Sequence, residues 1–444
     1  MTGLTTAPQT SEALPGKGLI IAFDAFVEGA LQTARGRLAD QPAVTPSHPL
    51  LNGVPYSVFR REIDIDTRRE IGAFFSSGDM AAALAKMISG RIKDDGLVLD
   101  PTCGIGDLLL ARAADLPVAD TLESTVAAWG KQLAGFDTRS DLIRLCKARL
   151  CLMARARGGF TDEIDPLAAF PLIIESDMMA QESDSLLARA DAILFNPPFG
   201  KTTWARKLGW AAGEINAAAI FLDRLTAAIR PETPIAAVLP EVLRCGSRYE
   251  RFRTTLTARG YDGSFKVEGR FDAWTDVDVF TTLLIRTNSP AALWRTDIAD
   301  SGCTVDDFYE VRVGSVVPHR DPVTGPSRAY ICAKTTPAWD ADFKPETRRP
   351  YAGRVFAPPF VAIRRTSSPS DRFRAVATVV TGKDPVAVEN HLLVALPRDG
   401  TLKACKALMR ALRAERTNAR LNDLMRCRHL TTGAIKTLPW IDAV

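Results

Sequence analysis

Short apolar runs alternate with helical stretches between residues 72 and 286. Runs of this length, separated by stretches with helical periodicity, predict an α/β fold in which a parallel sheet carries helices on both faces. The runs are continuously apolar, which favours strands buried on both sides. Strands are expected at residues 97–100, 133–137, 172–175, 192–195, 235–239 and 280–286, and the clearest helices at 79–89, 141–157 and 216–229.

The pattern changes at both ends of this region. Residues 1–16 are polar and rich in Thr, Gly and Pro, so we expect disorder there, followed by a helix near 20–39. After Pro290 the pattern becomes irregular, with many Pro and Gly residues, which indicates a second domain. The expected layout is a partly disordered N-terminal extension at 1–59, the α/β domain at 60–287 and a smaller C-terminal domain at 288–444.

Charge is distributed unevenly along the chain. The whole sequence holds 56 Lys and Arg against 52 Asp and Glu, but residues 348–444 hold 18 basic and 7 acidic residues. Such a segment is either a solvated basic face or a surface for a polyanion, most simply nucleic acid. On the second interpretation, the first residues expected to contact DNA are Arg364, Arg365, Arg372 and Arg374.

Cysteine and histidine usage narrows the class of protein. The eight Cys residues include no Cys-x-x-Cys pair, and the four His residues are scattered. We therefore expect no metal site and no disulfide framework, only the reduced thiols of a cytoplasmic protein. No apolar run reaches membrane-spanning length, and the run at 18–23 is too short for a secretory signal, so no membrane partner is expected.

The segment Asp100-Pro-Thr-Cys-Gly-Ile-Gly106 directly follows an expected strand. Ligands bind at the carboxyl ends of the strands in open α/β sheets, and glycine lets the backbone turn tightly and approach a ligand closely. Leu109 stands where a dinucleotide-binding fingerprint has its third glycine, so the segment predicts a different ligand, or only a strand–helix turn.

Two acidic residues stand at the ends of later strands. Asp137 ends the second strand, where a carboxylate can accept hydrogen bonds from ribose hydroxyls. Asp177 follows the third strand and could accept one from an adenine amino group. Each acid is otherwise a helix cap or a solvated turn. The distance in sequence from Gly104 to Asp137 exceeds that of a compact unit, so residues 112–131 are expected to be an insertion.

The tetrapeptide Asn196-Pro-Pro-Phe199 follows the apolar strand at 192–195. The lone pair of an amine on an aromatic ring is delocalised, so the amine is a poor nucleophile. The Asn196 side-chain oxygen and the Pro197 carbonyl can each accept one N–H, which fixes the amine and aims its lone pair at a methyl sulfonium. The two prolines make the loop rigid, and Phe199 offers an aromatic face for a base swung out of a helix. The alternative is a Pro-rich turn with a buried Phe.

With these residues in place, the chain resembles the gamma-class amino-methyltransferases that methylate adenine N6 in DNA in restriction–modification systems. The resemblance covers about residues 72–286 and includes Gly72-Ala-Phe-Phe-Ser-Ser77, where Ser-Ser stands in place of the family's usual Thr-Pro. It implies a Rossmann-like methyltransferase sheet that uses S-adenosyl-L-methionine, followed by a smaller C-terminal target-recognition domain.

The resemblance also implies roles for particular residues. Asp100 and Gly104 would hold the methionine part of S-adenosyl-L-methionine, Asp137 its ribose and Asp177 its adenine ring. The full set of expected cofactor-binding residues is Phe75, Ser76, Ser77, Asp100, Pro101, Cys103, Gly104, Gly106, Asp137 and Asp177. The expected catalytic residues are Asn196, Pro197, Pro198 and Phe199.

The implied activity is methyl transfer to the N6 amine of a flipped adenine in DNA, sequence-specific and linked to restriction–modification or phage defence. No nuclease or helicase signature is present, so a nuclease or specificity subunit would be a separate chain. Two alternatives stay open: an RNA or protein-glutamine methyltransferase, and a non-catalytic DNA-recognition subunit of a defence complex. The basic C-terminal segment favours nucleic acid over a protein target, and the intact tetrapeptide argues against a non-catalytic subunit.

Overall fold

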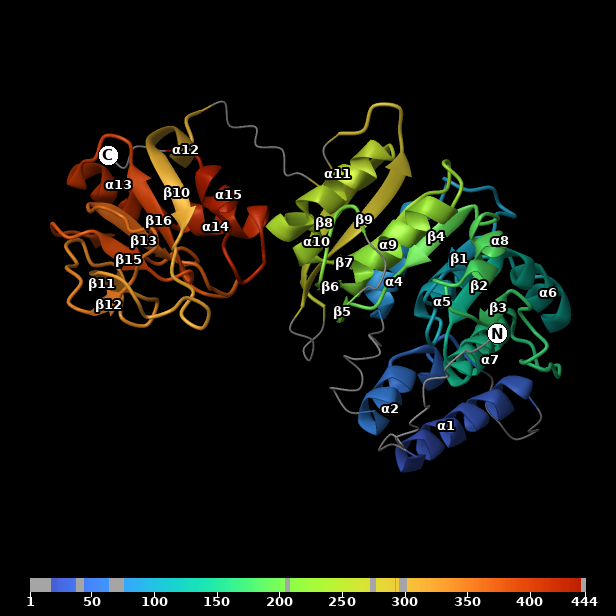
Figure 1. Cartoon of the computed structure of the whole chain (residues 1–444). Helices are drawn as coiled ribbons and strands as arrows, with labels where there is room; N and C mark the ends of the chain where they lie inside the picture. Colours follow the sequence, from blue (N-terminus) through green and yellow to red (C-terminus); the bar gives the residue numbers. More distant parts are fainter. Residues whose placement is uncertain are drawn as a thin grey trace, which may run out of the picture.

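A seven-stranded sheet lies at the centre of the first part of the chain (Figure 1). The computed structural model describes residues 17–36, 44–63, 76–203, 208–271, 277–291, 293–294 and 302–440. The strand order is β3 (Ile173–Glu175), β2 (Leu133–Asp137), β1 (Val98–Asp100), β4 (Ala192–Phe195), β7 (Ile235–Pro240), β9 (Asp278–Arg286) and β8 (Tyr261–Arg270). The first five strands are parallel, and β9 is antiparallel to both β7 and β8. The predicted Rossmann-like α/β class is confirmed.

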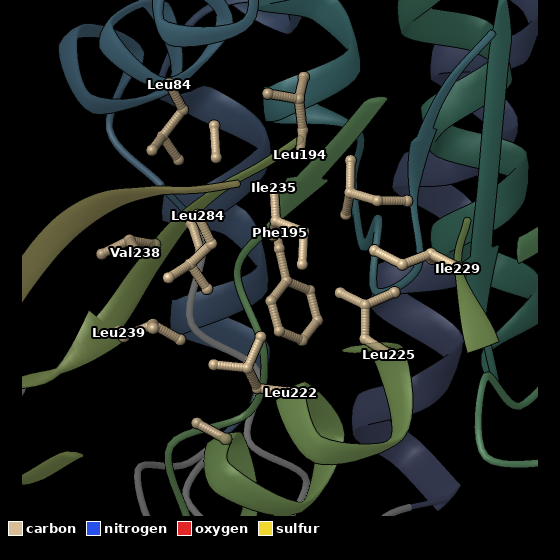
Figure 2. Packing of buried hydrophobic residues seen from close by; sticks show 14 of the residues in the cluster. Leu84, Leu194, Phe195, Leu222, Leu225, Ile229, Ile235, Val238, Leu239 and Leu284 are labelled. Carbon is tan, nitrogen blue, oxygen red and sulfur yellow. The ribbon is translucent and has the colours of Figure 1, made fainter. Parts of the chain in front are cut away.

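Helices cover both faces of this sheet. In Figure 2, Leu84 and Leu222 lie on opposite sides of the layer formed by β4 and β7. Leu194 and Phe195 are neighbours on β4 and point to these opposite faces, as the two-residue period of a strand requires. All four β4 residues are therefore buried, which explains the continuously apolar run. The helices of this part are α4 (Gly78–Ile88), α5 (Asp107–Ala113), α6 (Leu122–Gln132), α7 (Ser140–Gly158), α8 (Asp184–Leu187), α9 (Ala217–Ala228), α10 (Glu241–Cys245) and α11 (Glu250–Ala258).

Short elements complete this part of the chain. A two-stranded sheet, formed by β5 and β6, follows the end of β4. Among the described helices, none has the combination of length and apolar character needed to cross a bilayer. The bounds of these short elements are β5 (Lys201–Thr203), β6 (Glu214–Asn216), η2 (Gln181–Ser183) and η3 (Ser247–Tyr249).

Helices near the N-terminus pack on the outside of α7. The helix α1 (Lys17–Arg35) begins before the expected position 20, and its expected end at 39 lies outside the described residues. It is followed by η1 (Pro49–Leu51) and α2 (Val54–Glu62). Their buried aromatic and aliphatic side chains join one core cluster with α6 and α7. The disorder expected for 1–16 also concerns residues outside the described ranges.

The stretch expected to be an insertion holds an integral helix. Within α6, Val126 and Trp129 are buried in the core cluster that also contains α7. The Trp129 indole N–H donates to the Pro117 carbonyl at 2.7 Å, so the one polar atom of this buried ring is satisfied. The crossover from β1 to β2 is therefore made by two helices, α5 and α6, and the stretch expected to be an insertion packs into the core.

The region after residue 302 forms two further sheets. The order β10-β16-β13-β14 makes an antiparallel four-stranded sheet, and β12-β11-β15 makes a three-stranded one. One face of the larger sheet packs against α13, α14 and α15, with Cys405, Leu408 and Leu412 buried along α13. The bounds are α12 (Val305–Phe308), β10 (Tyr309–Val313), β11 (Ser327–Ile331), β12 (Arg348–Pro350), β13 (Phe360–Arg364), β14 (Ala377–Val380), β15 (Val386–Val388), β16 (Leu392–Pro397), α13 (Leu402–Leu412), α14 (Glu415–Leu424) and α15 (Thr432–Lys436).

The two regions meet where α10 contacts the end of α14. Arg244 and Glu241 form an ion pair whose side chains are both 2% exposed. The Arg244 guanidinium also donates to the carbonyls of Asp423 and Leu424 at 3.2 Å, the last residues of α14. A cation next to the C-terminal carbonyls of a helix satisfies unpaired acceptors and opposes the negative end of the helix dipole.

The four arginines expected to bind DNA differ in how far their side chains are exposed. Arg374 is 1% exposed and lies among neutral acceptors: its guanidinium donates to Ser367, Asn422 and the carbonyls of Met425 and Cys427. It holds the end of α14 in place, so its assignment to a DNA surface is wrong. Arg364 and Arg365 are partly exposed, and Arg372 is exposed.

Candidate active site

The carboxyl ends of β1 to β4 surround a cavity of about 210 Å³. Parallel strands point these ends to one edge of the sheet, so residues far apart in sequence meet there. The predicted residues that line the cavity are Ser76, Asp100, Pro101, Cys103, Gly104, Asp137, Asp177, Asn196 and Pro198. Sequence reasoning did not single out the other lining residues, which are Thr102, Asp107, Leu108, Thr138, Arg139, Leu142, Ser176, Met178 and Phe221.

Four of the predicted site residues do not line this cavity, and a fifth lies outside the described residues. Ser77 accepts a hydrogen bond from the Met80 N–H at 3.4 Å, so its structural role is the N-cap of α4. Gly106 has a left-handed backbone (φ 88°), and a Cβ there would lie 2.5 Å from the Cys146 sulfur. It serves the close packing of α5 on α7. Pro197 is buried, and Phe75 lies outside the described residues. Phe199 is also absent from the cavity lining.

Asp100 is the most deeply buried acid of the site, with 1% of its surface exposed. Its carboxylate accepts the Thr102 N–H at 3.0 Å, which closes the turn after β1. Burial, with a smaller contribution from the Asp137 and Asp107 carboxylates, raises the pKa of Asp100 to about 8. A cation bound next to this carboxyl would compensate the lost hydration and favour the charged form.

Asp137 joins the turns that follow β1 and β2. One carboxylate oxygen accepts the Gly104 N–H at 3.1 Å, and the other accepts the Arg139 N–H at 3.0 Å. Burial raises the pKa of Asp137, against these two bonds. Each carboxylate oxygen has two lone pairs, so both can still accept one hydrogen bond from a ligand hydroxyl. The exposed Asp177 accepts the Met179 N–H at 2.8 Å in its own turn.

The backbone and the side chain of Asn196 are each held by a hydroxyl group. The Asn196 amide Nδ2–H donates to Ser76 Oγ at 3.1 Å, and Thr102 Oγ1 donates to the Asn196 carbonyl at 3.1 Å. The structure thus brings the start of the tetrapeptide into the same cavity as Asp100 and Asp137.

Phe199 lies beside the cavity rather than in it. The residue is 6% exposed, and its ring meets the Phe271 ring edge to face, with centroids 5.2 Å apart. Its carbonyl accepts the Asn216 side-chain N–H at 2.7 Å. To stack on a base, this ring would have to present a face that the surrounding core covers here, so its stacking role stays a prediction.

A first prediction concerns the Asp100→Asn variant. Burial raises the pKa of Asp100 to about 8, whereas the unfolded chain releases this proton above about pH 3.8, so the contribution of Asp100 to stability should be lost as pH rises towards 8. The variant keeps the acceptor for Thr102 but carries no titratable group. We expect the Tm of the variant to fall less than that of the wild type between pH 5 and pH 8, so that at pH 8 the variant has the higher Tm, by about 2–4 °C. Thermal unfolding of both proteins at pH 5 and pH 8 measures this, and parallel pH dependences would show that Asp100 ionises normally.

Comparison with known proteins finds one family model that part of this chain resembles. Residues 55–232 match the family model described as N-6 DNA methylase. Comparison with curated protein sequences gives no match. In structure, the chain is similar to the type IIL restriction–modification enzyme MmeI in complex with DNA, with a TM-score of 0.54 and 14% identity, covering 87% of this chain and 70% of that chain. This similarity shows a shared fold.

Two further structural similarities are weaker. The type IIG restriction endonuclease BpuSI has a TM-score of 0.48 and 13% identity, covering 96% of this chain and 70% of that chain. The type I restriction enzyme EcoKI M protein has a TM-score of 0.36 and 12% identity, covering 60% of this chain and 56% of that chain.

Proposed function

We propose, from the match of residues 55–232 to the N-6 DNA methylase family model, that the protein transfers a methyl group from S-adenosyl-L-methionine to the N6 amine of a flipped adenine in DNA. The observation that carries the proposal is the single cavity lined both by Asp100 and Asp137 and by Asn196. A methyl donor and an amine must meet in one place for direct transfer, and this cavity holds residues suited to each.

The cavity residues fit S-adenosyl-L-methionine by their chemistry. The predicted acids Asp100, Asp137 and Asp177 line the cavity together with Asp107, which is already paired with Arg149. The most buried of the predicted acids has a raised pKa that a positive ligand would lower. A cofactor with an ammonium group, a sulfonium, ribose hydroxyls and a ring amine offers each acid a cation or a donor. When bound, it supplies a methyl group already activated by the sulfonium.

The tetrapeptide would prepare the target amine. The Asn196 side-chain oxygen and the Pro197 carbonyl would each accept one N–H, which orients the nitrogen lone pair and withdraws it from the ring. Pro197 and Pro198 restrict the backbone, so both acceptors are held in place before the amine arrives. The nitrogen would then bond to the methyl carbon as the carbon–sulfur bond of the sulfonium breaks and leaves a neutral thioether, and the extra proton of the product amine would pass to an acceptor or to water.

The basic C-terminal segment would hold DNA near this cavity. Arg372 is exposed and Arg364 and Arg365 are partly exposed, so these three are the first candidates for phosphate contacts. We expect their triple replacement by Ala to lower DNA affinity for all sequences and to reduce the slope of log affinity against log salt by about one unit per lost contact. Fluorescence anisotropy at several salt concentrations measures both. An unchanged slope would mean that these side chains form a solvated face.

The activity itself is tested by offering labelled S-adenosyl-L-methionine with unmethylated DNA, RNA and protein side by side. Mass spectrometry of the digested DNA should find N6-methyladenine. N4-methylcytosine without N6-methyladenine would overturn the choice of base. Label found only in RNA or in protein glutamine would favour the alternative methyltransferases, and DNA binding without any transfer would favour a recognition subunit. Sequencing that reports modified bases would then give the target sequence. The proposal includes a role in restriction–modification or phage defence, with any nuclease or specificity subunit on a separate chain.

A further inference from the structure

We propose that Thr102 and Ser76 are positioning residues that set the orientation of Asn196 for methyl transfer. The inference deepens the proposed function and rests on it. It starts from the two hydroxyl contacts to Asn196, one on its carbonyl from Thr102 and one on its side-chain amide from Ser76, both at 3.1 Å. The resemblance to the methyltransferase family assigned neither of these contacts.

The Ser76 contact selects one orientation of the Asn196 amide. An asparagine amide carries two N–H donors at one end and an acceptor oxygen at the other, and its last torsion has broad, roughly two-fold preferences. Ser76 Oγ accepts from Nδ2, and Ser76 is itself only 8% exposed. The opposite orientation would turn N–H groups towards the N–H groups of the target amine. A fixed amide therefore prevents a mismatch between two sets of donors.

The Thr102 contact fixes the backbone of the same residue. The paired register of β1 and β4 ends at Leu99 and Ile193, so Asn196 lies beyond the ladder that aligns the two strands. Thr102 Oγ1 bridges this gap by donating to the Asn196 carbonyl, while the Thr102 N–H donates to Asp100 Oδ1. One short chain of hydrogen bonds thus connects the acid proposed to hold the methyl donor with the residue proposed to hold the acceptor.

The chain contains a matched control for a purely structural role. Thr233 Oγ1 donates to the Ala190 carbonyl at 3.0 Å, just before β4, and Thr233 is 1% exposed. A threonine hydroxyl therefore binds a backbone carbonyl on either side of β4, but only the contact from Thr102 reaches Asn196. If such bonds served only the fold, removing either one would have the same consequences.

The experiment compares Thr102→Val with Thr233→Val, which are nearly isosteric and each remove one hydroxyl. Both should lower Tm by similar amounts. Only Thr102→Val should lower kcat, by about tenfold, with little change in the Kd of S-adenosyl-L-methionine measured by calorimetry. Thr102→Ser should restore most of the rate. Equal kcat in the two valine variants, no rescue by serine, or a loss explained by cofactor affinity would each overturn the proposal for Thr102.

Ser76 is tested by a readout that does not depend on activity. In protein labelled with ¹⁵N-asparagine, the Asn196 side-chain N–H signals should exchange slowly with water and should become faster, or move, in Ser76→Ala but not in Ser76→Thr. Unchanged signals in Ser76→Ala would overturn the Ser76 role. The wild-type transfer assay tests the proposed function separately. If the methylated substrate proves to be RNA or protein, kcat of each variant relative to the wild type is measured on that substrate. These relative kcat values decide the positioning roles in the same way.

Discussion

Replacing Asn196 with Ala is expected to lower kcat for methyl transfer by about 10²–10³-fold, the usual cost of removing one preorganised group that stabilises a transition state. The affinity for S-adenosyl-L-methionine should stay nearly unchanged. The reason is that the two sets of residues come from different parts of the sheet: Asp100 and Asp137 are the last residues of β1 and β2, whereas Asn196 follows β4. Calorimetric titration with the cofactor, next to a radiolabel transfer assay, measures both quantities.

The control for this prediction is Asn52→Ala, which removes an exposed asparagine bonded to the carbonyls of Pro46 and His48. It should leave transfer unchanged. Near-normal activity in Asn196→Ala would remove Asn196 from the reaction. A loss of cofactor affinity as large as the loss of rate would place it in the cofactor site instead.

Replacing Arg374 with Ala is expected to destabilise the protein by about 3–5 kcal/mol. The change leaves buried acceptors on Ser367, Asn422 and two carbonyls without their donor, and it opens a cavity under α14. Arg372 lies only two residues away but is exposed, and its guanidinium lies 5.2 Å from the Phe373 ring centroid. Its replacement by Ala should change stability by no more than about 0.5 kcal/mol.

Chemical unfolding of the two variants, followed by tryptophan fluorescence, measures this difference. DNA affinity is compared among the variants that remain folded. Arg372→Ala should lose salt-dependent DNA affinity, whereas Arg374→Lys should keep it. Equal stability losses at the two positions would contradict the structural role assigned to the buried guanidinium.

The fold could be predicted where burial leaves a simple pattern in the sequence. The strand at 192–195 is apolar throughout because helices cover both faces, and its predicted bounds agree with β4. In contrast, β8 was not predicted. Its ten residues lie at the edge of the sheet, where most side chains are partly exposed, and it includes Gly263 and Gly269 and an irregularity near Gly269. An edge strand of this kind has neither a continuous apolar run nor a regular alternation.

The site could be predicted where chemistry demands a residue type at a strand end. Asp100, Asp137 and Asn196 share one cavity, as strand order alone would suggest. Thr102 was not singled out, because the sequence does not distinguish a threonine hydroxyl exposed to solvent from one that donates to a distant backbone carbonyl. Arg374 was misassigned for a related reason: sequence shows its charge, whereas its burial depends on α14, more than forty residues later.

The contact between Arg244 and the end of α14 has a consequence for building chimaeras. If the region after residue 302 is the proposed target-recognition domain, a graft that exchanges it would be cut between β9 and α12. That cut separates α14 from the arginine on α10 that caps it, and leaves the buried ion pair of Arg244 with Glu241 facing a foreign helix end. The unit that can be exchanged therefore includes α10 as well, or requires an acceptor protein that already carries both residues.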